Sequence, residues 1–268
     1  MSLEGVDMAG RRIVAGYDGT AGSQAAVRLA AAEAGEGGAL RIVHARLERP
    51  AYALLRPPGV VRSADEEARR LVDGVRGLVR REHPELNVRA VVSTAGAGAA
   101  LVRVARGADL LIVGRSGTGP AGVSAHVLRW ASCPVTVVGA GVAPTWDPGR
   151  PVVLGYGAGA HAAAAVPHAF RAAQARGAGL RVCHVRGPDD DGRAPDAEVR
   201  REVSEALAGW RAAFPDVAVA VDVLAGIDPA ARLLDAAAGA ALLVVGDHGS
   251  GRAGVLVRNA DCPVTVVA

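Results

Sequence analysis

The segment ADLLIVGRSGTG, residues 108–119, decides the fold because it joins a short apolar run to a glycine-rich turn. A similar segment, AALLVVGDHGSG, recurs at residues 240–251. An uninterrupted apolar run of this length is typical of a strand buried on both faces of a parallel sheet. Loops that follow such strands lie at the carboxyl edge of the sheet, where α/β proteins bind ligands. The two segments therefore predict an α/β fold that occurs twice.

Three further pairs of segments repeat in the same order along the chain. They are IVAGY (13–17) with VVLGY (152–156), RIVHAR (41–46) with RVCHVR (181–186), and ASCPVTVV (131–138) with ADCPVTVV (260–267). A tandem duplication explains this order. We predict an N-terminal tail at residues 1–10, a first domain at 11–140, a linker at 141–150 and a second domain at 151–268.

Each half alternates apolar runs with amphipathic segments. In the first half we predict strands at 11–17, 39–45, 87–93, 109–114 and 134–138, with helices at 21–34, 62–82, 97–106 and 122–130. In the second half we predict strands at 151–156, 180–185, 216–224, 241–245 and 263–267. Alternating strands and helices imply a doubly wound parallel sheet with helices on both faces, because the crossovers are right-handed.

Composition restricts the classes of protein that fit this chain. Half of its 268 residues are hydrophobic, but no apolar run reaches the roughly 18 residues of a membrane helix. Its three cysteines, Cys133, Cys183 and Cys262, do not form a disulfide framework. The first residues lack the hydrophobic core of an export signal. We therefore expect a cytoplasmic protein with no membrane contact.

All thirty basic residues are arginine, and the net charge is +3. These arginines alternate with acids along predicted helices, as at 66–70, 76–82 and 200–205. Such mixing is typical of solvated helix faces, so we expect no nucleic-acid partner. The absence of lysine also excludes a P-loop lysine and Schiff-base chemistry.

Four features together resemble the universal stress protein family. They are VAGYDGTAGSQAA at 14–26, the strand that ends near His44, ADLLIVG followed by Gly-x-x-Gly, and the CPVTVV last strand. The resemblance implies two Rossmann-like domains, each with five parallel strands in the order 3-2-1-4-5. It also implies dimers or tandem pseudo-dimers that act in cytoplasmic stress responses. Some members of the family bind ATP and others do not.

The implied strand order predicts where a ligand would lie. Strands one and four would be neighbours at the point where the winding direction reverses, and a crevice is expected outside their carboxyl ends. Asp18 follows the first strand and Gly114 ends the fourth, so both would border this crevice. The resemblance implies that Asp18 and Ala45 contact the adenosine portion of ATP.

The resemblance also implies a phosphate loop, in which backbone N–H groups and a helix N-terminus face the anion. Its candidate residues here are Gly114, Arg115, Gly117 and Gly119, with Arg115 as a phosphate clamp or as a solvent-exposed side chain.

The family's loop reads Gly-x-x-Gly, nine residues, then Gly-Ser or Gly-Thr. In this chain only three residues separate Gly117 from the corresponding place at 121–122. In the second half, Gly157 replaces the aspartate and the loop is shorter again. Losing two hydrogen bonds to phosphate would cost about 3–6 kcal/mol. We therefore expect ATP to be at most a weak ligand of the first half and not a required cofactor.

Several of these residues also have a purely structural interpretation. The glycines at 114, 117 and 119 could serve a strand-to-helix turn that needs positive φ values. Asp18 could cap the following helix together with Thr20. His44 and His184 occupy equivalent strand ends, which favours a shared structural hydrogen bond over catalysis. Ser124 lies inside a predicted helix and lacks the pattern of a nucleophile elbow. No set of metal ligands is spaced for a metal site.

These observations support three hypotheses. The first is a stress-response binding or regulatory protein whose halves form an internal pseudo-dimer through residues 134–138 and 263–267, with an unidentified regulatory partner and a further homodimer as additional contacts. The second is a nucleotide switch or slow ATPase that uses Asp18, Ala45, Gly114 and Gly117. The third and least favoured is an enzyme of the wider nucleotide α-hydrolase-like superfamily, because no catalytic residue stands out.

Overall fold

A computed structural model describes residues 10–46, 58–115, 122–140, 147–157, 160–187, 194–246 and 251–268. The chain forms two compact units, Met1–Gly141 and Val142–Ala268. Among the described residues, no helix combines the length and apolar character needed to span a bilayer.

The first unit alternates strands and helices as predicted. Its elements are β1 (Arg12–Gly16), α1 (Ala21–Ala34), β2 (Ala39–Ala45), α3 (Pro58–Glu82), β3 (Asn87–Ser93), α4 (Ala97–Val104), β4 (Leu110–Gly114), α5 (Val123–Trp130) and β5 (Val135–Val138). The strands pair in parallel in the order β3-β2-β1-β4-β5. The predicted doubly wound sheet with order 3-2-1-4-5 is therefore confirmed for this unit.

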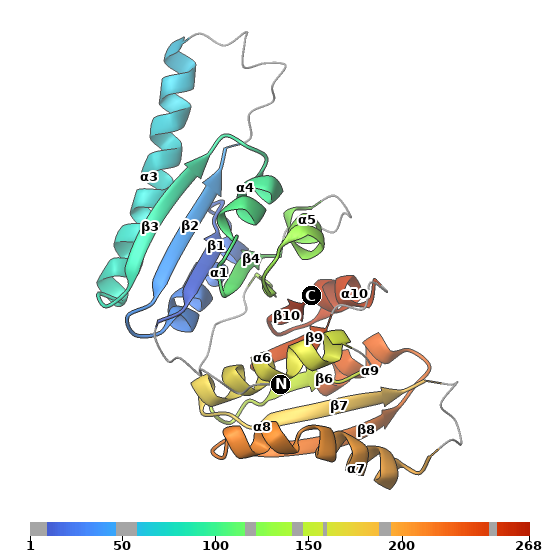
Figure 1. The fold of residues 1–268 in the computed structure, drawn as a ribbon. Helices are drawn as coiled ribbons and strands as arrows, with labels where there is room; N and C mark the ends of the chain where they lie inside the picture. The colour runs from blue at the N-terminus through green and yellow to red at the C-terminus, as the bar shows by residue number, and fades with distance from the viewer. Residues whose placement is uncertain are drawn as a thin grey trace. The chain divides into compact units, whose positions relative to one another are not determined.

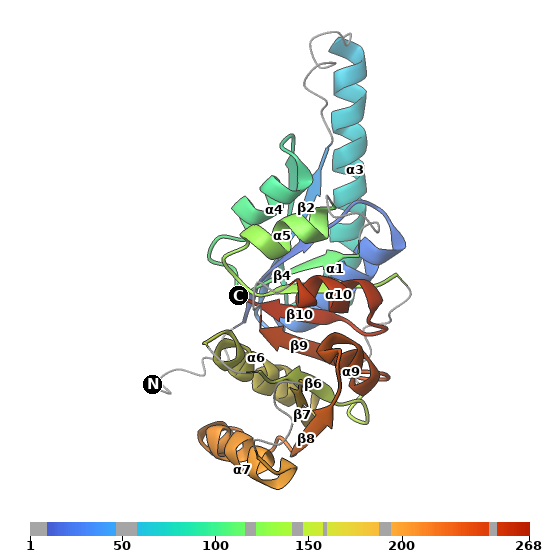
Figure 2. The ribbon, with the colours of Figure 1, turned by 90° about the vertical axis from the view of Figure 1, so that its right-hand side faces the viewer.

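The helices of the first unit cover the two faces of its sheet. Helices α1 and α3 lie on one side of the strands, and α4 and α5 lie on the other (Figures 1 and 2). Right-handed crossovers require this division, because the chain moves across the sheet in one direction from β1 to β3, through α1 and α3, and in the other direction from β3 to β5, through α4 and α5. The apolar stripe of α3 illustrates the packing, since Val72, Val75 and Val79 are buried.

The second unit repeats the same plan. Its elements are β6 (Val152–Gly155), α6 (Ala160–Arg176), β7 (Leu180–Arg186), α7 (Asp196–Ala206), α8 (Ala208–Ala213), β8 (Val219–Ala225), α9 (Pro229–Ala236), β9 (Leu242–Gly246), α10 (Arg252–Asn259) and β10 (Val264–Val267). The parallel order β8-β7-β6-β9-β10 confirms the prediction for this half as well. In Figure 2, α6 and α7 lie on one side of these strands and α9 lies on the other.

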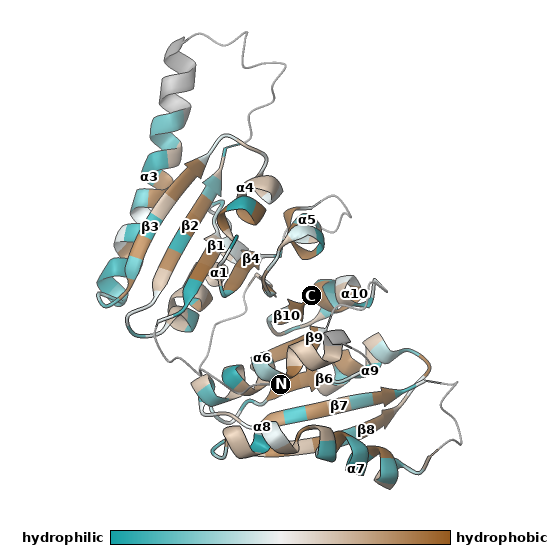
Figure 3. Cartoon of the chain, viewed as in Figure 1, coloured by the Kyte–Doolittle hydropathy of each residue, from teal (hydrophilic) through white to brown (hydrophobic). Residues whose placement is uncertain are grey.

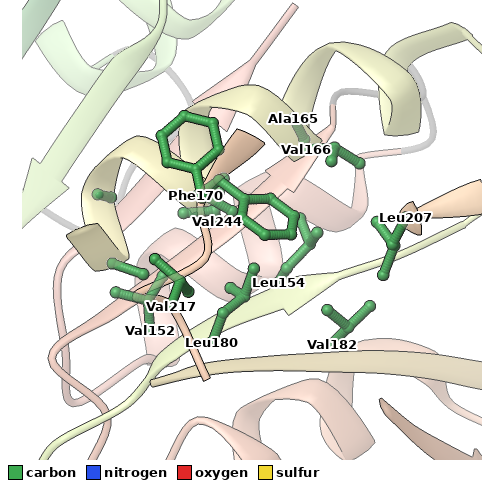
Figure 4. Close-up of a cluster of buried hydrophobic side chains, with 14 of the residues drawn as sticks. Val152, Leu154, Ala165, Val166, Phe170, Leu180, Val182, Leu207, Val217 and Val244 are labelled. Atoms are coloured by element: carbon green, nitrogen blue, oxygen red, sulfur yellow. The ribbon is translucent and has the colours of Figure 1, made fainter. Parts of the chain in front are cut away.

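The core of the second unit is built around aromatic rings. Phe170 and Phe214 are the only two phenylalanines of the chain, and both are almost completely buried. Their ring centroids lie 5.5 Å apart, and the ring of Trp210 lies 6.2 Å from that of Phe214. Figure 4 shows aliphatic side chains of the strands, among them Leu154 and Val244, around Phe170. Aromatic pairs at such separations add to the free energy that area burial alone contributes.

Two helix starts differ in how their free N–H groups are satisfied. Asp228 caps α9, since its Oδ1 accepts hydrogen bonds from the N–H groups of Ala230 and Ala231 at 2.9 and 3.3 Å. At the corresponding position of the first unit, Gly96 precedes α4 and provides no side-chain cap. The second unit therefore depends on a carboxylate at a place where the first unit has none.

Replacing Asp228 by alanine should lower the free energy of unfolding by about 1 kcal/mol, because two N–H groups of α9 lose their acceptor. The change Asp216→Ala, at an exposed turn residue of the same unit, is the matched control and should stay within about 0.5 kcal/mol of the parent. Urea unfolding followed by circular dichroism measures both. Equal losses in the two variants would contradict the capping role.

Candidate functional site

The predicted site residues lie at the carboxyl ends of three neighbouring strands. Asp18 lies two residues beyond β1, Ala45 ends β2, and Gly114 ends β4. The register pairs Gly16 with Val43 and Ala15 with Ile112, so these three strand ends share one edge of the first sheet. This is the point at which the winding direction reverses, where the sequence analysis predicts a ligand crevice.

Asp18 organises the turn between β1 and α1. Its Oδ1 accepts hydrogen bonds from the N–H of Thr20 at 3.0 Å and from the Thr20 hydroxyl at 2.6 Å. Thr20 is the N-cap of α1, and its Oγ1 accepts a hydrogen bond from the N–H of Ser23. Asp18 therefore supports the N-cap of α1 through Thr20. This agrees with the capping role that the sequence analysis gives as one interpretation of Asp18.

The Asp18 carboxylate remains ionised at neutral pH. Partial burial acts to raise its pKa, but the hydrogen bonds from Thr20 and Ser23 outweigh that effect and hold the pKa below the ordinary value of 3.8. Because enough of the side chain remains exposed to solvent, the site presents a negative charge at this edge.

A histidine on the second strand of each unit binds the end of the first strand. The Nδ1 atom of His44 lies 2.9 Å from the carbonyl oxygen of Tyr17, and that of His184 lies 3.1 Å from the carbonyl oxygen of Tyr156. A carbonyl oxygen only accepts hydrogen bonds, so Nδ1 is the donor in both units. The two equivalent bonds agree with the structural interpretation of these histidines.

The arginine two residues after each histidine pairs with an acidic residue of the next helix, which the sequence analysis did not anticipate. Arg46 lies 2.9 Å from the carboxylate of Asp65, and Arg186 lies 2.8 Å from that of Asp196. Both arginine side chains are largely buried, at 13% and 14% exposure. The repeated His-x-Arg spacing in RIVHAR and RVCHVR was the signal available in the sequence.

Gly114 is required by a close backbone approach. A Cβ at this position would lie 2.6 Å from the carbonyl carbon of Gly22 and 2.7 Å from the nitrogen of Ser23, both in the first turn of α1. Its φ angle is not positive, so the interpretation that residue 114 needs positive φ is wrong. Glycine is needed here because α1 packs directly on the end of β4.

Arg115 and Ser124 connect the end of β4 to β5 and to α5. The N–H of Arg115 donates to the carbonyl oxygen of Val138 at 2.7 Å, and its side chain is half-buried. The buried Ser124 hydroxyl donates to the carbonyl oxygen of Gly114 at 3.4 Å, which ties α5 to β4. Gly117 and Gly119 lie outside the described residues.

The structure brings some predicted site residues together and separates others. A Cβ on Gly22 would lie 3.7 Å from both the Gly114 Cα and the Arg115 oxygen, so the turn that holds Asp18 lies beside the end of β4. Ala45 lies on β2, on the opposite side of β1 from β4. In the second unit Gly157 stands where Asp18 stands in the first, so that edge lacks this carboxylate.

Among the described residues, no three His, Cys, Asp or Glu side chains group closely enough to hold a metal ion.

The architecture defines a pair of doubly wound α/β domains with a polar edge at the reversal of strand order. The Universal stress protein family profile matches residues 10–139 and 149–268, and the chain belongs to this family. A universal stress protein of Mycolicibacterium smegmatis is 32% identical over 260 residues, which cover 89% of this chain and 87% of that protein. One from Mycobacterium tuberculosis is 30% identical over 266 residues, covering 91% and 89%.

A solved structure shows the same fold over the whole chain. The crystal structure of a universal stress protein from Archaeoglobus fulgidus superposes with a TM-score of 0.76 and covers 97% of this chain and 96% of that one. Its sequence is 15% identical, so the likeness concerns the fold. The family resemblance inferred from the sequence motifs is confirmed.

The change Gly114→Ala should destabilise the first unit by about 1–3 kcal/mol, because the added methyl group meets backbone atoms that cannot rotate away. Gly74→Ala is the control, since Gly74 lies within α3 with open space around it and should stabilise the unit by roughly 0.5–1 kcal/mol. Opposite signs in denaturant unfolding are expected. A stabilised Gly114→Ala variant would show that α1 does not pack on β4 as described.

The three cysteines should be chemically inert in the folded protein. Burial raises the pKa of the Cys133, Cys183 and Cys262 thiols to about 11. Only about one thiol in a thousand is then ionised at pH 8, and the thiolate is the reactive form. Iodoacetamide followed by mass spectrometry should show no labelling in buffer and complete labelling in urea. Rapid labelling of the native protein would contradict this expectation.

Proposed function

We propose that this chain is a non-enzymatic, cytoplasmic stress-response protein that acts by binding, and whose first domain retains at most a weak adenine-nucleotide site. Family membership supports the general role. The observation that carries the weak-site part of the proposal is the structural use of Gly114 and Arg115.

At the position of the family's phosphate loop, this chain uses its groups to hold the fold. The missing side chain of Gly114 makes room for α1, and the N–H of Arg115 is already bonded to Val138. An N–H that is bonded within the fold gives no gain when it turns to phosphate, because one hydrogen bond replaces another. Together with the six residues missing from the loop relative to the family pattern, this favours weak ATP binding.

A nucleotide switch or slow ATPase is the second candidate, and one observation favours it. The ionised Asp18 and the half-buried Arg115 flank the same strand ends, since Gly22 at the start of α1 lies against residues 114 and 115. A carboxylate that accepts ribose hydroxyls and a guanidinium that binds phosphate would be the minimal pair for holding a nucleotide.

The two domains are proposed to associate with each other as a pseudo-dimer. Each sheet order ends at a strand that reads VTVV, β5 in the first unit and β10 in the second. An uncovered apolar edge strand would invite aggregation, so pairing through these strands is the arrangement that protects both.

Calorimetric titration with ATP and ADP, alongside mass spectrometry of nucleotide that co-purifies, tests the weak-site proposal. We expect no binding at micromolar ATP, millimolar affinity at best, and a preparation free of nucleotide. Asp18→Ala should then change little, and Asp216→Ala is the matched control. Micromolar affinity that disappears in Asp18→Ala but persists in Asp216→Ala would overturn the weak site in favour of the switch.

A further inference from the structure

Charge is unevenly distributed over the two faces of the first unit. From the start of β3 to the end of β5, residues 87–138 contain five arginines and a single acid, Asp109. Neither of the helices on this face, α4 and α5, contains an acidic residue. Helix α3, on the other face, contains five acids, and they form helix-surface pairs such as Asp73 with Arg76. The face that carries α4 and α5 is therefore basic.

Two arginines lie directly opposite each other on this face. Arg41 of β2 and Arg89 of β3 are register partners in a parallel pair, so their side chains leave the same side of the sheet. Both are exposed. Figure 1 shows no helix over β3 on this side, and Figure 3 shows hydrophilic bands across β2 and β3. Within the part of the chain that the structure describes, neither guanidinium has a hydrogen-bond or ion-pair partner.

The second unit neutralises the equivalent arginine. Arg181 occupies the place of Arg41, as the register with the central strand shows, and Ala220 lies opposite it in β8. Arg181 forms an ion pair with Asp222 and donates to the carbonyl oxygen of Ala236 at 3.2 Å. The fold can therefore hold an arginine at this position in an ion pair, as it does for Arg181. The juxtaposition of Arg41 and Arg89 belongs to the first unit.

Protection of the sheet edge explains the charge of Arg89 but not that of Arg41. β3 is the first strand in the order of its unit, and a charge such as Arg89 is a common device against edge-to-edge pairing. Arg41 lies on the inner strand β2, where no such device is needed. Like charges directly opposite each other destabilise a sheet, so the fold gains nothing from retaining both.

We propose that Arg41 and Arg89 form a binding site for a phosphate-type oxyanion. The two side chains start about 4.8 Å apart, one strand spacing, which lets two guanidinium forks converge on the oxygens of one phosphate group. Asn87, two residues before Arg89 on the same face, is exposed and adds amide donors. Arg12 on β1 is already paired with Asp109 and contributes only the general positive field.

This site is separate from the nucleotide edge. Arg41 lies four residues before Ala45 on β2, which places it about 13 Å from the carboxyl end of the strand. The proposal therefore stands independently of any ATP binding, and an anion without an adenine ring is the suitable probe.

Calorimetric titration of the full chain with inorganic pyrophosphate at low ionic strength tests the site. We expect saturable binding with one site per chain that Arg41→Gln and Arg89→Gln each weaken by about tenfold or more. Arg28→Gln is the control, because it removes the same charge from an exposed position on α1, on the other face.

A thermal unfolding series provides a second measurement. Without anion, Arg41→Gln and Arg89→Gln should melt at or above the temperature of the parent, because a like-charge repulsion is removed. With pyrophosphate, the parent and Arg28→Gln should be stabilised and the two site variants should not. Equal weakening in Arg28→Gln, retained binding in a variant that carries both Arg41→Gln and Arg89→Gln, or no saturable binding by the parent would each overturn the proposal.

Discussion

The contact between the first turn of α1 and the end of β4 is the constraint on which the carboxyl edge of the first unit depends. Gly114 has no space for a Cβ because the backbone of Gly22 and Ser23 occupies that position. This contact places the cap formed by Asp18 and Thr20 beside the fourth strand. At Gly114 the space that the missing side chain leaves is filled by α1, which under the proposal above makes this position part of the packing and not of a ligand site.

The two units share a frame but differ at the positions that a ligand would reach. In both, a histidine binds the carbonyl that ends the first strand, and the arginine two residues later pairs with an acid of the next helix. The exposed groups around this frame diverge, since Asp18 becomes Gly157 and the unpaired Arg41 becomes the ion-paired Arg181. Duplication has preserved the groups that hold the strands together and has left the solvent-facing ones free to change.

Most of the fold could be predicted from the sequence, because apolar runs such as 110–113 and 242–245 indicate buried strands. The internal repeat also lets each strand be assigned independently in both halves. Boundaries differed at helix ends, since the helix predicted at 62–82 begins at Pro58 and the helix predicted at 97–106 ends at Val104. The ends of a helix depend on local hydrogen bonds that the apolar pattern does not report. The candidate site was less predictable. The reason for Gly114 lies in a contact with residues far away in the chain, and the pairing of Arg41 with Arg89 depends on strand register.

The histidine bond at the strand ends determines which ring nitrogen stays open to other partners. Because the carbonyl oxygens of Tyr17 and Tyr156 only accept hydrogen bonds, each ring carries a proton on Nδ1. In the neutral ring Nε2 is then an acceptor, so it can accept a hydrogen bond but cannot donate one. The neighbouring Arg46–Asp65 and Arg186–Asp196 ion pairs tie the ends of β2 and β7 to the helices that follow them. The end of the second strand in each unit is thus held by two bonds of different chemistry, and one of them fixes the tautomer of a histidine ring.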